Sequence, residues 1–264
     1  MALIVMAVFD TEENKRTDFT QKCIASLLAT TNLAKHRLCF VDNASCRETK
    51  SFLYGAKIRV NNWNKEERVT IITNEENIGT AKAVNKGIKL RQPGEYVIKM
   101  DNDVTFHKRN WVDEMEEVIS RMPSIGILGL KRNDLMESPY AINTEQRSRL
   151  LEVDHKPGQK WYVVEDCKHV MGTCTMINHL LLDKVGYFYQ MHGLYGFDDS
   201  LLCVRSNVAG FLNCFLHGVS IDHIDPGGGE YTDWKDKYAG EMLTKYGQEE
   251  HDYRNGLKSI YHED

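Results

Sequence analysis

Residues 95–103 read EYVIKMDND, an apolar stretch of strand length followed directly by two acids. The apolar part predicts a strand that is buried on both faces, as in a parallel sheet. Ligand sites in open α/β sheets lie just beyond the carboxyl ends of such strands. Asp101 and Asp103 therefore stand where a ligand site is expected, provided that the flanking sequence supplies the rest of the sheet.

Apolar runs of strand length also lie on both sides of this segment, and they alternate with amphipathic helical stretches. The strands are predicted at residues 3–9, 38–41, 69–73 and 125–130, and the helices from about Thr17, over 79–91 and over 111–122. Four or five strand–helix alternations predict an α/β fold, with a mainly parallel sheet flanked by helices on both faces.

Beyond residue 131 the periodic pattern fades while the density of charge rises. We expect an irregular, solvated connection over residues 131–166. Later strands are predicted at 170–177 and 213–219, with a helix from about Asp199 between them. The charged and aromatic tail from Thr232 fits either a closing lid or a surface helix.

Composition narrows the class of protein. The 264 residues carry a net charge of −5, and 42% of them are hydrophobic, which suffices for a core in one or two domains. The slightly negative charge weighs against a dedicated nucleic-acid binder, whose affinity comes largely from phosphate contacts. Seven cysteines, an odd number without a C-x-x-C pair, favour reduced thiols and a cytoplasmic protein over a disulfide framework.

The sequence shows no targeting or membrane-spanning pattern. The apolar residues 2–9 are short, lack a basic leader and run directly into acidic residues. Every apolar run falls short of the roughly 18 residues that a membrane span needs. We therefore expect no integral membrane segment.

The two acids of residues 101–103 have a chemical reason to lie together. In an extended segment residues i and i+2 point the same way, so Asp101 and Asp103 would present their carboxylates together. Such carboxylates repel each other unless a cation lies between them. A Mg²⁺ or Mn²⁺ ion that shares oxygens with a diphosphate would relieve this repulsion. The alternative is a solvated turn, since Asp and Asn favour turns.

Four segments form an ordered set within the first 110 residues. They are VMAVFD at 5–10, VDNAS at 41–45, NIGTAKAVNKG at 77–87 and DND at 101–103. This set resembles the family-2 glycosyltransferases, which have the GT-A nucleotide-sugar-binding fold. Phe9 stands where the family usually has an aromatic residue, and Asp10 stands where Asn is usual. Asp42 aligns with an acid that commonly contacts the nucleotide.

A second series lies in the later part of the chain. Residues 185–188 read VGYF and residues 195–199 read YGFDD, followed by Arg205 and then by Gly and Phe at 210–211. The series is similar to the family's V-G-x-F, acidic pair, Arg and Gly-aromatic pattern. The resemblance implies that Asp199 is the general base for the acceptor hydroxyl, beside Asp198 in place of the usual Glu.

Physical chemistry supports an acidic pair at this place, although a structural reading is also open. A neighbouring acid raises the pKa of one member of the pair and so improves its basicity. The alternative is a helix start, because the positive end of the helix dipole favours Asp198 and Asp199 there.

His223 resembles the late histidine that many family members place near the metal and the diphosphate. An imidazole suits Mn²⁺ and can complete a carboxylate site. His217 is a competitor six residues earlier, and a lone histidine is more often structural.

The resemblance implies one GT-A domain over residues 1–264, with a nucleotide-sugar-binding half at 1–131 and an acceptor-binding, catalytic half at 132–264. The expected activity is metal-dependent transfer of a hexosyl or pentosyl group from a nucleoside-diphosphate sugar, UDP-linked, with inversion. The expected acceptor is a hydroxyl of a glycan, a protein or a modified DNA base.

The implied site has three parts. Donor binding is expected at Phe9, Asp10, Asp42, Asn77, Gly79, Asp101 and Asn102; Mn²⁺ or Mg²⁺ is expected at Asp103, Asp101 and His223; catalysis is expected at Asp199 and Asp198. A different class remains open, namely a non-catalytic GT-A module that binds a nucleotide or glycan. A nucleotidyltransferase is disfavoured, because the early Gly-rich nucleotide loop is missing.

Overall fold

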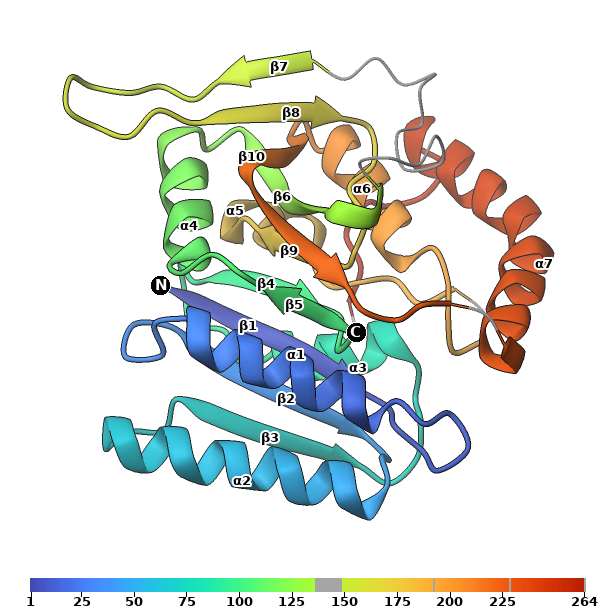
Figure 1. The fold of residues 1–264 in the computed structure, drawn as a ribbon. Helices are drawn as coiled ribbons and strands as arrows, with labels where there is room; N and C mark the ends of the chain where they lie inside the picture. Colours follow the sequence, from blue (N-terminus) through green and yellow to red (C-terminus); the bar gives the residue numbers. More distant parts are fainter. Residues whose placement is uncertain (136–148, 192, 228, 264) are drawn as a thin grey trace.

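The first half of the chain forms four parallel strands in the order β3-β2-β1-β4 (Figure 1). The computed structural model describes residues 1–135, 149–191, 193–227 and 229–263. The strands are β1 (Ala2–Val8), β2 (Arg37–Asn43), β3 (Val69–Asn74) and β4 (Tyr96–Met100). Because β1, β2 and β4 are buried on both faces, their sequences are nearly continuous apolar runs. The predicted α/β class is confirmed.

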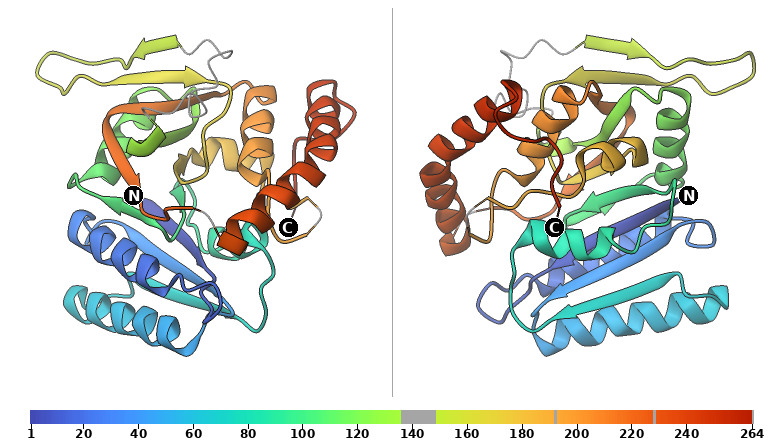
Figure 2. Two further views of the ribbon diagram at one scale, coloured as in Figure 1. Left: turned by 45° about the vertical axis from the view of Figure 1, so that its right-hand side comes forward. Right: turned by 180° about the vertical axis from the view of Figure 1, so that it is seen from behind.

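Helices cover both faces of this sheet (Figures 1 and 2). One face carries α1 (Thr17–Thr30), α2 (Arg47–Asn64) and α4 (Trp111–Arg121), and the other carries α3 (Thr80–Ile88). Side chains of β1 alternate between the two cores, since Ile4 and Met6 pack with α1 while Leu3 and Val5 pack with α3.

The helix α2 has no counterpart among the predicted helices. Its buried stripe consists of Thr49, Leu53, Ala56 and Val60, so only two of the four positions are large and apolar. A stripe of this kind gives a weak periodic signal, although tertiary packing still stabilises the helix.

The strand β9 (Cys174–Ile177) joins the two halves of the chain into one sheet. It lies antiparallel between β4 and β6 (Ile125–Arg132). The long strand β10 (Leu212–His223) then runs parallel to β6 and pairs at its far end with β5 (Val104–Phe106). The sheet of the described residues has ten strands and is mixed: neighbours within β3-β2-β1-β4 are parallel, as are β6 and β10, and the other pairs are antiparallel.

We expected an irregular connection over residues 131–166, and this prediction is wrong for most of the residues described there. β6 continues to Arg132, the 3₁₀ turn Asn133–Leu135 follows, and β7 (Arg149–Glu152) pairs with β8 (Val163–Cys167) at the sheet edge. These strands give little apolar signal because β7 is largely exposed and β8 contains the acids Glu165 and Asp166. Residues 136–148 of this connection lie outside the described residues.

The described residues of the second half form three helices: α5 (His179–Val185), α6 (Asp198–Val208) and α7 (Gly229–Arg254). The charged tail forms α7, a helix at one side of the molecule (Figure 2). Tyr253 near its end packs against Leu201 and Val204 of α6. Among the helices of the described residues, none has the length and apolar character to cross a membrane.

Arg205 of α6 is fully buried and ties separated segments together. Its guanidinium donates to the backbone carbonyls of Val185, Tyr187 (2.8 Å) and Ile260 (2.7 Å). Because Arg205→Met leaves these carbonyls without a donor, we expect the free energy of unfolding to fall by about 2–4 kcal/mol in urea denaturation. The control Arg254→Met removes an exposed ion pair on α7 and should lower it by less than about 0.5 kcal/mol. Equal losses in the two variants would contradict this prediction.

Candidate active site

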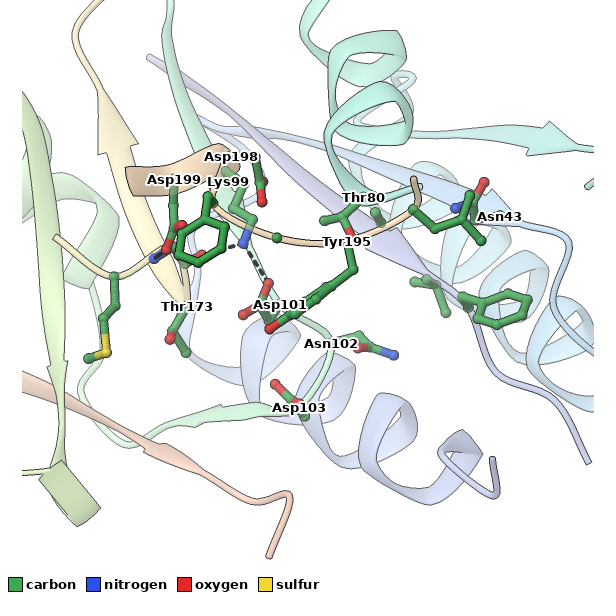
Figure 3. A pocket seen from close by; sticks show the side chains of 18 of the residues that line it. Asn43, Thr80, Lys99, Asp101, Asn102, Asp103, Thr173, Tyr195, Asp198 and Asp199 are labelled. Carbon is green, nitrogen blue, oxygen red and sulfur yellow. Dashed lines mark hydrogen bonds and ion pairs between the residues drawn. The ribbon is translucent and has the colours of Figure 1, made fainter. Parts of the chain in front are cut away.

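A pocket of about 780 Å³ lies at the carboxyl ends of β1 and β4 (Figure 3). Both halves of the chain line it, through the end of β1, the turn at 101–103, the loops at 171–173 and 194–197, the start of α6 and the end of β10. This is the place where open α/β sheets bind ligands. The loop at 171–173 also explains why the strand predicted at 170–177 begins only at Cys174.

Four of the predicted donor-binding residues line the pocket, namely Phe9, Asn77, Asp101 and Asn102. The side-chain oxygen of Asn77 accepts hydrogen bonds from Asn43 Nδ2 (2.6 Å) and from the Gly79 amide (3.0 Å). Gly79 has a φ of 90°, and a Cβ there would meet the Gln190 side chain at 2.5 Å. The conformation and the close packing both require glycine at this position, which is absent from the pocket lining, whereas Asn43 is part of that lining.

Asp10 and Asp42 are buried beside the pocket and are absent from its lining. Asp10 accepts hydrogen bonds from the Thr49 hydroxyl (3.1 Å) and from Asn102 Nδ2 (3.0 Å), and burial raises the pKa of Asp10. Asp42 accepts the Ser45 amide at 2.8 Å, which holds the turn after β2. Both acids thus hydrogen bond to residues around the pocket, and their direct contact with a nucleotide stays a prediction.

Asp101 and Asp103 both line the pocket, but they contact different cations. Asp101 Oδ1 lies 2.6 Å from the Lys99 ammonium, whereas Asp103 is buried and paired with Arg16. Residues 102 and 103 form a turn instead of an extended segment. The expected joint presentation of the two carboxylates is therefore replaced by two separate ion pairs.

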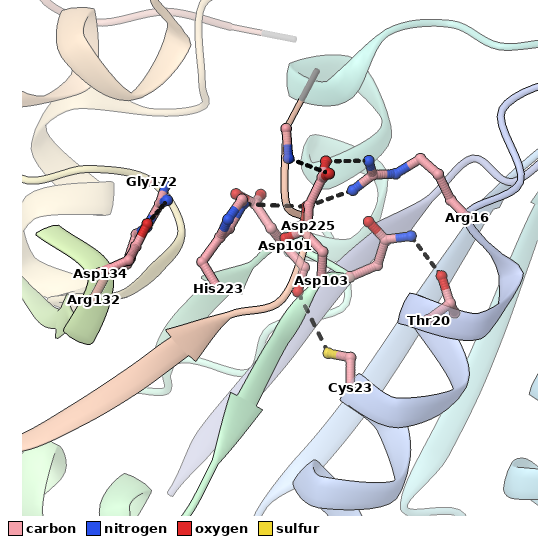
Figure 4. A network of polar contacts seen from close by, with 12 residues as sticks. Arg16, Thr20, Cys23, Asp101, Asp103, Arg132, Asp134, Gly172, His223 and Asp225 are labelled. Carbon is pink, nitrogen blue, oxygen red and sulfur yellow. Dashed lines mark hydrogen bonds and ion pairs between the residues drawn. The ribbon is translucent and has the colours of Figure 1, made fainter. Parts of the chain in front are cut away.

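Groups from two segments that are distant in sequence converge at Asp103 (Figure 4). The Arg16 guanidinium contacts Asp103 and also Asp225, whose Oδ2 lies 2.5 Å away. His223 Nε2 lies 3.4 Å from Asp103 Oδ2. Carboxylates and an imidazole are ligand types that Mn²⁺ accepts, and Asp103, Asp225 and His223 supply them here, where Arg16 already pairs with both acids. Arg16 compensates the acidic charge beside them.

Of the two histidines that the sequence offers as ligands, His223 is the one at the pocket. His217 Nε2 lies 3.3 Å from Glu165 Oε2 and is absent from the pocket lining. The geometry therefore favours His223 over His217.

A second group with metal-ligand chemistry lies outside the pocket, at the start of β1. One ligand atom each of His36, Asp113 and Glu116 lies within 4.8 Å of the others. Both acids are already paired with Lys35. His36 Nδ1 accepts the Ala2 amide at 3.2 Å, so Nε2 carries the ring proton toward Asp113. A protonated Nε2 does not ligate a metal, and this group is an ion-pair network.

Asp198 and Asp199 begin α6 and line the pocket from the second half of the chain. Asp199 Oδ2 accepts the Gly172 amide at 2.8 Å, and its Oδ1 accepts the Ser200 amide at 2.8 Å. His169 Nε2 lies 4.0 Å from Oδ2. These bonds hold the Asp199 carboxylate in one orientation.

The two adjacent acids differ in pKa. Burial first, and the charge of Asp199 second, raise the pKa of Asp198 to about 6. Burial also acts to raise the pKa of Asp199, but His169, Lys99 and the backbone amides outweigh it and lower that pKa. The split expected of an acidic pair is present, with the higher pKa on Asp198.

Lys99, Arg16 and Asp225 are pocket or cluster residues that the sequence-based site does not contain. Lys99 offers a signal, since it is the one charged residue in the apolar strand β4. Arg16 and Asp225 carry no such signal; Arg16 is identified by its place in the pocket lining and its contact with Asp103, and Asp225 by its contact with Arg16.

The sheet order and the acidic pocket at its carboxyl edge define an α/β protein of the GT-A class. The chain belongs to glycosyl transferase family 2, whose model matches residues 4–186. The resemblance read from the sequence is thereby confirmed. A search of curated proteins finds no significant match.

Solved glycosyltransferase structures share this fold at low sequence identity. The mannosyltransferase PcManGT from Pyrobaculum calidifontis, in complex with GDP-Man and Mn²⁺, has a TM-score of 0.66 at 16% identity, over 93% of this chain and 62% of its own. GalNAc-T7 with UDP, GalNAc and Mn²⁺ has a TM-score of 0.59 at 16% identity, over 84% of this chain and 44% of its own. S. aureus TarS 1-349 in complex with UDP has a TM-score of 0.54 at 17% identity, over 84% of this chain and 59% of its own. This chain thus spans less than two thirds of each of these proteins.

Proposed function

We propose that this chain is an inverting, metal-dependent glycosyltransferase that moves a sugar from a nucleoside diphosphate to an acceptor hydroxyl. One observation carries the proposal: a single pocket holds a carboxylate–histidine group at one place and an adjacent acidic pair at another. The first suits a metal-bound diphosphate, and the second suits proton removal from an acceptor. Membership of glycosyl transferase family 2 supports this reading.

The donor side of the pocket lies mainly in residues 1–131. Phe9, Asn77 and Asn102 would surround the nucleoside, and Asp101 would reach the ribose or the metal. Asp10 supports this surface from behind through its bond to Asn102. We therefore assign nucleotide-sugar binding to the first half of the domain.

The diphosphate side is built around Asp103. Asp103, His223 and Asp225 would hold Mn²⁺ or Mg²⁺, which when bound stabilises negative charge on the departing diphosphate. Arg16 lies against the same acids and adds a fixed positive charge at this place.

The acceptor side lies in residues 132–264, with Asp199 as general base. Asp199 would take the proton of the acceptor hydroxyl as that oxygen attacks the anomeric carbon and the diphosphate leaves. A single displacement of this kind inverts the anomeric carbon. The amides of Gly172 and Ser200 hold the carboxylate, while Asp198 lies beside it with a higher pKa.

For the donor we propose a UDP-linked hexose or pentose, since UDP is named with two of the structurally similar proteins. The acceptor class is a glycan, a protein or a modified DNA base. The seven cysteines are free thiols, which supports a reducing, cytoplasmic setting.

A donor screen tests the proposed function. Purified protein is heated with UDP-, GDP- and CDP-sugars, each with Mn²⁺ or with a chelator, and release of nucleoside diphosphate is then measured with candidate acceptors. At a donor concentration of 100 Kd, we expect a stabilisation of about 2.7 kcal/mol that the chelator removes. Stabilisation without release on any acceptor would favour the non-catalytic module. If the protein shows no stabilisation by any donor and no release of nucleoside diphosphate, the proposal is refuted.

A further inference from the structure

Lys99 is a buried charge inside an apolar strand. It is only 5% exposed, and its neighbours in β4 are apolar or aromatic. A buried ammonium destabilises a fold unless it is paired and hydrogen bonded. The pocket supplies these partners, so the reason for this charge lies at the site.

A chain of short contacts runs from Asp101 through Lys99 to Asp199 (Figure 3). The Lys99 ammonium lies 2.6 Å from Asp101 Oδ1 and donates at 2.6 Å to the carbonyl oxygen of Gly172. The amide of the same Gly172 donates to Asp199 Oδ2 at 2.8 Å. Gly172 thus accepts a hydrogen bond from Lys99, on the donor side, and donates one to Asp199, on the acceptor side.

Topology explains how these groups meet. β9 pairs antiparallel with β4, and Thr175 lies opposite Lys99. The loop that precedes β9 therefore passes the carboxyl end of β4, where the Asp101 amide donates to the Thr173 carbonyl at 2.9 Å. This loop carries Gly172 to the start of α6.

Gly172 has no room for a side chain. A Cβ at this position would lie 2.9 Å from the Lys99 nitrogen, 2.9 Å from Asp199 Cβ and 3.1 Å from Asp199 Oδ2. Contacts this close require the neighbours to move, so a residue with a side chain would displace Lys99, Asp199 or the loop. The backbone of Gly172 itself is the connector.

We propose that Lys99 and the Gly172 backbone form a bridge that positions the Asp199 carboxylate relative to the donor-side carboxylate Asp101. Lys99 is a positioning residue, since it acts on the acceptor through Gly172 and Asp199. The proposal rests on the proposed transferase function. It predicts that damage to the bridge slows transfer while donor affinity is largely kept, because Asp103 and the nucleoside-facing residues remain in place.

Two variants break the bridge from opposite ends. Lys99→Met keeps an unbranched side chain that is one atom shorter and removes the charge. Gly172→Ala keeps the charge and forces Gly172 away from Lys99 and Asp199. For both we expect kcat to fall by about 10–100-fold, as a misplacement near 1 Å does. The donor Kd, measured by calorimetry with UDP and Mn²⁺, should change by less than about threefold.

Each variant has a matched control outside the pocket. Lys108→Met removes an ammonium that also contacts a carboxylate, on Glu114, and a backbone carbonyl, on Gly218. Gly55→Ala adds a methyl group in α2 where nothing lies within 4 Å. Both controls should keep kcat within about twofold of the wild type.

The outcomes separate this inference from the proposed function. A wild-type chain without transfer on any donor would defeat the proposed function itself. With an active wild type, kcat near the wild-type value in either folded bridge variant would overturn the bridge. A loss confined to donor Kd would also overturn it, because Lys99 would then act only in donor binding. If Lys99→Met does not fold, Gly172→Ala decides alone.

Discussion

Replacing Asp199 by asparagine is expected to lower kcat by about 10²–10⁴-fold, the usual contribution of a general base. Asparagine keeps the size of the side chain and can still accept one of the two amide hydrogen bonds, from Gly172 or Ser200. It cannot take a proton from the acceptor. Because Asp199 is held by the amides of Gly172 and Ser200 and not by residues of the Asp103 cluster, the donor Kd should change by less than about threefold. Single-turnover kinetics and calorimetry measure the two quantities.

Asp198→Asn is the matched control, since it changes the adjacent acid of the same pair. We expect it to lower kcat by less than about tenfold. The reverse order, with Asp198→Asn inactive and Asp199→Asn active, would move the base to Asp198.

The pH dependence of transfer separates the two acids independently. A general base works only when it is ionised. The pKa of Asp199 lies below its ordinary value, so transfer that depends on Asp199 should persist as the pH falls through 6. The pKa of Asp198 is about 6, so transfer that depends on Asp198 should decline below that pH. If kcat declines at low pH with an apparent pKa near 6, and Asp198→Ala shows the same decline, both Asp199 as the base and Asp198 as the group with the pKa near 6 are contradicted.

Asp103→Asn is expected to lower kcat/KM by about 10³-fold and to abolish stabilisation by donor and Mn²⁺. A metal ion supplies several kcal/mol of charge stabilisation to a leaving group, and each 1.36 kcal/mol is tenfold in rate. Asp103 is buried next to His223 and provides the central carboxylate of that cluster. Steady-state kinetics and thermal shift with Mn²⁺ measure the effect.

The control for this variant is Asp222→Asn, on the same strand as His223 but turned toward His107 and Asn133. It should keep both kcat/KM and the Mn²⁺ response. Because Asp103→Asn also removes a partner of Arg16, its unfolding is measured without ligand. A full Mn²⁺ response in folded Asp103→Asn would show that the metal binds elsewhere and would refute the proposed metal site.

Much of the fold follows from local pattern. The buried strands of the first half were predictable because both faces are covered, which requires long apolar runs such as that of β1. The elements that escaped prediction are those whose burial is partial. The helix α2 buries a stripe that includes Thr49 and Ala56, and the hairpin of β7 and β8 lies at the sheet edge with little apolar sequence.

For the site, the sequence by itself pointed to the candidate residues, namely acids directly after β4 and an acidic pair at the start of α6, and the order of its motifs indicated the family. Only the tertiary structure decided which groups face one another. Arg16 meets Asp103 across 87 positions of the chain, and Gly172 meets Asp199 across 27. The different pKa values of Asp198 and Asp199 follow from such contacts. Coulomb and hydrogen-bond energies depend on distances in space, and linear spacing does not contain them.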